Sequence, residues 1–191
     1  MVDARTDPAK QIAAPFSAGT TRDLRAGDRV LITGRLLTAR DAAHQRLNDL
    51  IGQGLDLPVE LAGQVLYYVG PSPARPGRVI GSAGPTTSGR VDVYTPALLE
   101  RGLRGMIGKG YRSDAVKAAI VRHGAVYLVA TGGAGARLAR TIKSTRVVAW
   151  PDLGTEAIRE LEVEDFPAVV VHDAHGGDLY RDGQSLYRAS D

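Results

Sequence analysis

A glycine-rich segment with three consecutive hydroxyl residues is the first place where this sequence could do chemistry. It reads Gly84-Pro-Thr86-Thr87-Ser-Gly-Arg90. Backbone amides freed by glycine, hydroxyl groups and a guanidinium can all donate hydrogen bonds to one anion. The same composition is common in ordinary surface turns. Taken alone, the segment therefore leaves both an anion site and a plain turn open.

A second group of reactive side chains lies in the segment Thr38-Ala-Arg40-Asp41-Ala-Ala-His44. Thr38 with an acid three residues later predicts a capping box and a helix that runs to about Ile51. Arg40 then falls in the first helical turn, where the helix dipole disfavours a cation. A nearby anion would offset this unfavourable interaction. His44 follows on the same helix face. Asp41 could equally pair with Arg40 or serve only the cap, and a structural histidine is the commoner role for His44.

A lysine between two glycines is the third candidate. Lys109 follows a predicted strand, and the ends of strands are common ligand sites in open α/β sheets. Most single lysines are solvated surface charges, so this signal is weak by itself.

The segment Thr131 to Ala136 resembles a dinucleotide-binding turn between a strand and a helix. Leu138 stands where the third glycine belongs, and about 125 residues precede the strand, whereas such a motif usually opens its domain. We interpret the segment as a tight strand–helix turn. The histidines form no ligand cluster, with His172 and His175 assigned to a polar turn, so we predict no metal site.

The elements that must position these residues alternate between strand and helix. Strands are predicted over 28–37, 64–69, 104–107, 125–130, 146–150 and 168–172, the last turning back as a hairpin at 176–177. Helices are predicted over 38–51, from 95 to a stop at 102, and over 113–123, 134–142 and 155–160, and residues 70–89 are loop. The alternation predicts an α/β fold around a mixed sheet. Residues 1–23 are interpreted as a flexible arm, ordered at most against a partner, and 24–191 as the domain.

Bulk composition narrows the class of protein. The chain has 191 residues, a formal net charge of +3 and no cysteine. One domain fits this length, and the charge is too small to favour nucleic acid or a membrane surface. Without cysteine there is neither a disulfide nor a thiolate ligand. No apolar run approaches the length of a membrane span and the N-terminus lacks a secretory pattern, so a cytoplasmic protein is expected.

Taken together and in order, five segments resemble the C-terminal domain of class I fumarases. That domain is also the β subunit of two-chain fumarases and L(+)-tartrate dehydratases. The segments are 38–44, 84–90, 105–109, 152–157 and 163–167, and the resemblance covers roughly residues 25 to 180.

The resemblance implies a swivelling β/β/α domain that closes over a partner. This partner is an N-terminal domain or an α subunit, the latter giving an α2β2 heterotetramer, and it carries a [4Fe-4S] cluster on three cysteines. The open iron of the cluster acts as a Lewis acid on a C4 dicarboxylate. The absence of cysteine in this chain agrees with that division.

Residue roles follow from the same resemblance. Thr86 matches a threonine that acts in proton transfer, and Arg40, Arg90 and Lys109 match cations that hold the substrate carboxylates. Supporting positions are Asp41, His44 and Thr87. Cations placed beforehand would stabilise the negative charge that builds when a proton next to a carboxylate is removed.

Several functions are compatible with this assignment. Hydration of fumarate to malate leads, because the segment 162–167 (Glu-Val-Glu-Asp-Phe-Pro) is more similar to fumarases. L(+)-tartrate dehydration is the near alternative. A non-catalytic anion-binding module of the same fold and a nucleotide-binding protein built on Gly132 to Gly135 are the other classes.

Overall fold

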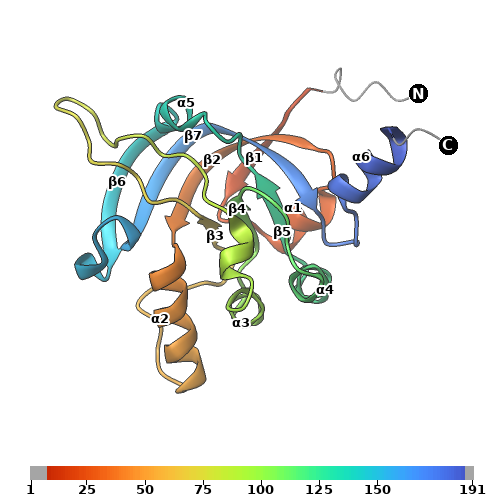
Figure 1. Cartoon of the computed structure of the whole chain (residues 1–191), viewed down its shortest axis with the longest axis horizontal. Helices are drawn as coiled ribbons and strands as arrows, with labels where there is room; N and C mark the ends of the chain where they lie inside the picture. The colour runs from red at the N-terminus through yellow and green to blue at the C-terminus, as the bar shows by residue number, and fades with distance from the viewer. Residues whose placement is uncertain (1–7, 188–191) are drawn as a thin grey trace.

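The computed structural model describes residues 8–187 and has a closed ring of five hydrogen-bonded strands. Four of them run parallel and lie side by side in the order β2 (Arg29–Thr38), β3 (Val65–Tyr67), β4 (Gly105–Gly108) and β5 (Val126–Val129). The long antiparallel strand β7 (Ile158–His172) closes the ring by pairing with both β5 and β2. Two further strands, β1 (Lys10–Ala14) and β6 (Ile142–Ala149), pair with β2 and β7 (Figure 1). The predicted mixed α/β fold is confirmed.

Alternating side chains give the strands two separate apolar cores. On β3, Val65 and Tyr67 pack inside the ring, whereas Leu66 and the next residue after the strand, Tyr68, face outward. The outward set packs against three helices, α2 (Asp41–Gly52), α3 (Thr95–Glu100) and α4 (Asp114–His123). Figure 1 places these helices together on one side of the strands. The helices therefore cover the outer face of part of the strand ring, and a separate core fills its inside.

Helix α4 begins and ends as the sequence predicts. Ser113 Oγ accepts a hydrogen bond from the Val116 amide, and Gly124 ends the helix in the left-handed region with a φ of 62°. By contrast, the capping box predicted at Thr38 is wrong. Thr38 is the last residue of β2, and its hydroxyl donates to Ala157 O and accepts from Arg159 N.

The N-terminal segment corrects the expected arm. Strand β1 pairs residue by residue with 30–34 of β2, and a short helix α1 (Ala18–Asp23) follows with Ser17 as its N-cap. Phe16 and Leu24 are buried. Residues 8–23 are therefore part of the domain, because β2 offers them an edge to pair with, while 1–7 lie outside the described residues.

Two predictions in the C-terminal third are also wrong. The helix predicted over 155–160 is replaced by a 3-10 helix η2 (Pro151–Glu156) and the start of β7. The hairpin predicted after Gly176 and Gly177 is reduced to one bridge between His172 and Asp178, followed by helix α6 (Leu179–Tyr187). Helix α5 (Gly135–Ala139) ends earlier than predicted. Among the described residues, no helix is both long and apolar enough to traverse a bilayer.

Candidate functional site

The carboxyl ends of the parallel strands β2, β3 and β4 lie at one edge of the ring. Because these strands are parallel neighbours, the residues that follow them come together there. Arg40 and Asp41 follow β2, Tyr68 follows β3, and Lys109 follows β4. Segments that are far apart in the sequence are thus assembled at one place.

The hydroxyl-rich loop returns to this edge and attaches to the end of β4. The Lys109 amide donates to Thr86 O at 3.1 Å, and the Ser88 amide donates to Lys109 O at 2.9 Å. Thr86 also donates twice to the Tyr68 carbonyl, from its amide at 2.8 Å and from its hydroxyl at 2.9 Å. The hydroxyl proton of Thr86 is therefore engaged, while its oxygen keeps lone pairs that can accept a hydrogen bond.

Gly108 makes this attachment possible. A Cβ atom at this position would lie 2.0 Å from Ser88 Oγ and 2.9 Å from a ring carbon of Tyr68. Only glycine at the end of β4 lets the loop approach so closely. Thr87 forms a parallel bridge with Lys109 and is exposed on the outer side of the loop.

Two arginines share one carboxylate at this edge. Arg90 Nε donates to Asp41 Oδ1 at 2.9 Å, and Arg40 Nη2 lies 3.7 Å from Asp41 Oδ2. The Arg90 side chain is 59% exposed and that of Arg40 21% exposed. Arg90 therefore keeps both terminal nitrogens of its guanidinium available to a ligand, while its Nε holds the side chain in place.

Glu156 is a site residue that our sequence reasoning did not assign. Its Oε1 lies 3.6 Å from Arg40 Nη2, and its Oε2 accepts a hydrogen bond from the Ala42 amide at 2.9 Å. Glu156 thus satisfies a free amide at the start of α2, the role that the sequence assigned to Thr38. The sequence signals were its place within the 152–157 segment and its position near the offset of a ribose-binding acid after the glycine turn at 131–136.

Arg40 lies in a close-fitting position. A Cβ at Gly70 would lie 2.8 Å from Arg40 Nη1, so the guanidinium passes directly over that glycine. Arg40 Nε is buried and has no hydrogen-bond partner among the described residues.

His44 is a buried support beneath Arg40. It has no exposed surface, and its Nδ1 donates to Arg40 O at 2.8 Å, since a carbonyl can only accept. The ring packs edge-to-face on Tyr68 with centroids 5.1 Å apart. Burial lowers the pKa of His44 to about 4, and the nearby Arg112 charge adds to the shift. A neutral His44 therefore holds the backbone of Arg40 rather than touching a ligand.

Lys109 is exposed, and the turn after β5 borders it. A Cβ at Gly132 would lie 3.8 Å from Lys109 Cδ. The segment that resembles a dinucleotide-binding turn is a strand–helix turn between β5 and the five-residue helix α5. Its glycines allow close packing: a Cβ at Gly135 would lie 2.9 Å from the amide nitrogen of Gly84.

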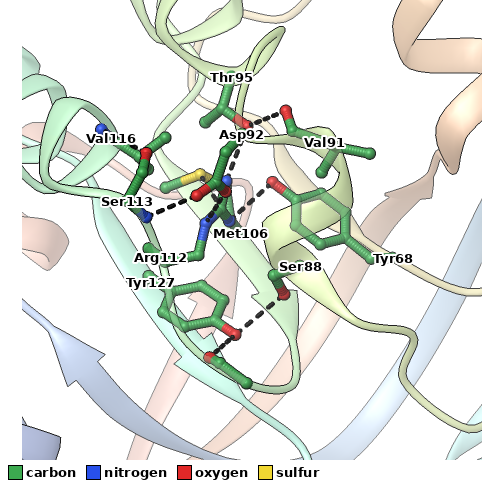
Figure 2. A network of polar contacts seen from close by, with 11 residues as sticks. Tyr68, Ser88, Val91, Asp92, Thr95, Met106, Arg112, Ser113, Val116 and Tyr127 are labelled. Carbon is green, nitrogen blue, oxygen red and sulfur yellow. Dashed lines mark hydrogen bonds and ion pairs between the residues drawn. The ribbon is translucent and has the colours of Figure 1, made fainter.

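A buried polar network beneath the site was not predicted. Figure 2 shows Arg112 at its centre, with Asp92, Tyr68 and Met106 around the guanidinium. Nothing in the sequence distinguishes Arg112 from the many other arginines. Its importance comes only from the folded contacts.

The assembled edge suits an anion with two carboxylates. Arg40, Arg90, Lys109 and Thr86 lie on segments that meet at this edge, and the Arg90 and Lys109 side chains are exposed. Within residues 8–187 no three His, Asp or Glu side chains gather in a way that could hold a metal.

Comparison with known proteins identifies the family of this chain. Residues 8–183 match the family described as "Fumarase C-terminus". This chain belongs to the fumarase C-terminus family. The predicted resemblance is therefore confirmed.

Relatives of this fumarase C-terminus domain occur in both one-chain and subunit forms. The chain is 40% identical over 176 residues to "Fumarate hydratase class I, anaerobic" of Escherichia coli, covering 91% of this chain and 31% of that protein. It is 41% identical over 156 residues to "Fumarate hydratase 2" of Leishmania major, covering 81% and 28%. It is also 35% identical over 176 residues to "Putative L(+)-tartrate dehydratase subunit beta" of Methanocaldococcus jannaschii, covering 87% and 90%. The chain thus spans about a third of the length of the fumarate hydratases and nearly the whole of the subunit.

Proposed function

We propose that this chain is the β subunit of a hydro-lyase that interconverts fumarate and malate at a site shared with a cluster-bearing α subunit. The observation that carries the proposal is that Arg40, Arg90, Lys109 and Thr86 lie on segments that meet at one strand edge. Membership of the fumarase C-terminus family supports the reaction class.

The proposed roles of the three cationic side chains follow from the charge of the substrate. A C4 dicarboxylate carries two negative charges, which Arg90, Lys109 and Arg40 would bind. Arginine suits a carboxylate because its planar fork can hold both oxygens. When the proton next to a carboxylate is removed, negative charge builds on that carboxylate, and cations already in place stabilise it most in the transition state.

Thr86 is proposed to exchange a proton with the substrate. Thr86 is half-buried, and its hydroxyl donates a hydrogen bond to Tyr68 O. In one direction of the proposed reaction this hydroxyl gives its proton to the substrate, and in the other the resulting alkoxide takes the proton back. A threonine is a weak base in water, so the surrounding cations and amides must favour the negatively charged form of the reacting group.

The [4Fe-4S] cluster in this proposal belongs to the α subunit. This chain has no cysteine, so its own donor set does not fit such a cluster. The cluster supplies Lewis-acid chemistry when it is present, and the side chains of this subunit bind the substrate, orient it and move a proton.

The proposed partner is a separate α subunit, in an α2β2 assembly in the cytoplasm. The name of the Methanocaldococcus relative, a subunit whose length this chain nearly matches, supports a separate partner. L(+)-tartrate is the second candidate substrate, favoured by the same relative.

The direct experiment is an anaerobic assay of fumarate hydration by this chain alone and by this chain co-expressed with its cluster-bearing partner. Activity only in the pair supports the proposal. An assembled, cluster-loaded pair that acts on tartrate but not on fumarate would shift the substrate to tartrate. A loaded pair that acts on neither substrate would contradict the proposal.

Arg90→Ala in the assembled enzyme should lower kcat/KM by about 100-fold or more, since it removes one preorganised cation. The fold should persist, because Arg90 is largely exposed. Arg122→Ala, which removes an exposed arginine at the end of α4, is the matched control and should leave turnover unchanged. Wild-type kinetics for Arg90→Ala would remove Arg90 from the site.

A further inference from the structure

A fully buried guanidinium connects the three segments that carry the candidate site. The Arg112 side chain has no exposed surface, and its Nε donates to Asp92 Oδ1 at 2.7 Å. Its Nη1 donates to Tyr68 Oη at 3.2 Å, and its Nη2 donates to Thr95 Oγ1 at 2.7 Å (Figure 2). All three nitrogens therefore have partners, which lie after β3 (Tyr68) and between η1 and the start of α3 (Asp92 and Thr95).

Two of these partners, Tyr68 and Asp92, lie next to a site residue. Tyr68 is the residue whose carbonyl accepts both hydrogen bonds from Thr86. Asp92 directly follows the 3-10 helix η1 (Ser88–Val91) that contains Arg90, and its Oδ2 accepts from the Ser113 amide at 2.5 Å. The guanidinium thus ties the backbone beside Thr86 to the backbone beside Arg90.

A second layer extends the connection to Lys109. Arg112 stacks over Tyr127 with its central carbon 5.0 Å from the ring centroid. The Tyr127 hydroxyl lies 2.9 Å from both Ser88 Oγ and Gly110 O. The Tyr127 hydroxyl therefore links the loop at Ser88 to Gly110, the residue that follows Lys109.

Because burying a charge is costly, we interpret the Arg112 guanidinium as a group that positions its partners rather than one that mainly stabilises the fold. Removing a guanidinium from water is costly, and apolar side chains of similar volume often stabilise a core as well or better. A lysine could not replace it, because one ammonium nitrogen cannot reach three acceptors that lie in different directions.

We infer that Arg112 is a positioning residue that fixes Thr86, Arg90 and Lys109 relative to one another. The inference rests on the proposed function, in which these three side chains act on one substrate. Arg112 itself is sealed beneath the site and makes no contact with a ligand.

The first test measures backbone order and needs no activity. In Arg112→Lys, amide hydrogen exchange at Thr86, Ser88 and Lys109 should accelerate by about tenfold or more, because their hydrogen bonds depend on the clamped segments. Amides inside β5 should be unaffected. Arg104→Lys is the matched control, since Arg104 donates to the carbonyls of His123 and Gly124 at the opposite end of β4.

The second test is a double-mutant cycle in the assembled enzyme. Arg112→Lys alone should lower kcat/KM by about 10- to 100-fold, as small misplacements of binding groups do. In an Arg90→Ala background the same change should cost a smaller factor than in wild type, because one of the three groups that Arg112 positions is gone. A purely structural substitution such as Arg104→Lys should act by the same factor in both backgrounds.

Tyr127→Phe is a second variant for the exchange measurement, to be used if Arg112→Lys does not fold. It keeps the aromatic core and should accelerate exchange at Ser88 and Lys109. Unchanged exchange at these amides, or equal factors in the two backgrounds, would overturn the inference. A wild-type pair inactive on fumarate, malate and tartrate would instead overturn the proposed function, and the exchange measurements would still decide whether Arg112 holds the segments.

Discussion

At the scale of single residues, the site depends on groups that never touch a ligand. His44 donates to the carbonyl of Arg40 from a position without solvent contact, and its pKa is lowered to about 4 by burial. A histidine that must stay neutral to fold couples stability to pH. In the unfolded chain it takes up a proton near pH 6.5, whereas the folded chain resists protonation.

His44 should therefore make the chain less stable as the pH falls from 6.5 toward 4. Its contribution is complete above pH 6.5, and about 3 kcal/mol of unfolding free energy is lost on the way down. His44→Asn keeps a side-chain donor near Arg40 O but does not titrate. The stability difference between wild type and this variant, measured by urea unfolding, should shrink or reverse as the pH is lowered.

His123→Asn at the end of α4 is the control for losing a histidine. If His44→Asn differed from wild type by the same free energy at pH 7 and at pH 4.5, His44 would not be held neutral by burial.

Sequence spacing indicated candidate residues for chemistry but not the contacts between them. Arg90 and Asp41 stand 49 positions apart, and no local pattern indicates their ion pair. No local signal indicates the contacts of Glu156 and Arg112, because their partners come from other elements. Thr38 shows the converse: a good capping pattern failed because β7 supplied its hydroxyl with other partners.

At the scale of elements, close contacts at glycines set how the hydroxyl-rich loop lies against β4. A Cβ at Gly108 would lie 2.0 Å from Ser88 Oγ, so Gly108→Ala must push the loop away. We expect a loss of about 1–3 kcal/mol in unfolding free energy, as for other overpacked positions. Urea unfolding measures the loss, and amide exchange at Ser88 should reveal the displaced loop.

Gly52→Ala is the matched control at the end of α2, where a Cβ meets nothing within 4 Å. It should leave stability unchanged or slightly raised. Equal stabilities for both variants would show that the loop accommodates a methyl group at Gly108.

Strongly patterned elements were predictable, and those decided by distant pairing were not. Helix α4 has a serine cap, an apolar stripe and a terminal glycine, all of which act locally. Strand β1 reads Lys-Gln-Ile-Ala-Ala and lies between prolines, so only its pairing with 30–34 of β2 makes it a strand. The first half of β7 is highly charged, and its strand form likewise comes from pairing with β2 and β6.

At the scale of the whole molecule, closure of the strand ring gathers the ends of β2, β3 and β4 at one edge. Exposed apolar side chains lie beside that edge. Val93, next to Asp92, is 75% exposed, and Tyr111, two residues after Lys109, is 64% exposed. Apolar groups bordering a charged site suit an interface whose core loses water on assembly. In the proposed function the site is shared, so the proposed α subunit would cover this edge.

Val93→Asp should therefore weaken binding of the cluster-bearing α subunit by about tenfold or more, because it places a charge where the interface would lose water. The variant should unfold within about 0.5 kcal/mol of wild type, since Val93 is a surface residue. Val121→Asp on α4, where the valine is 45% exposed away from the site edge, is the control and should bind the α subunit normally. The measurement is the affinity of each variant for the α subunit, made with purified subunits. Equal weakening by both variants would indicate a general charge effect, and no weakening by Val93→Asp would place the interface elsewhere.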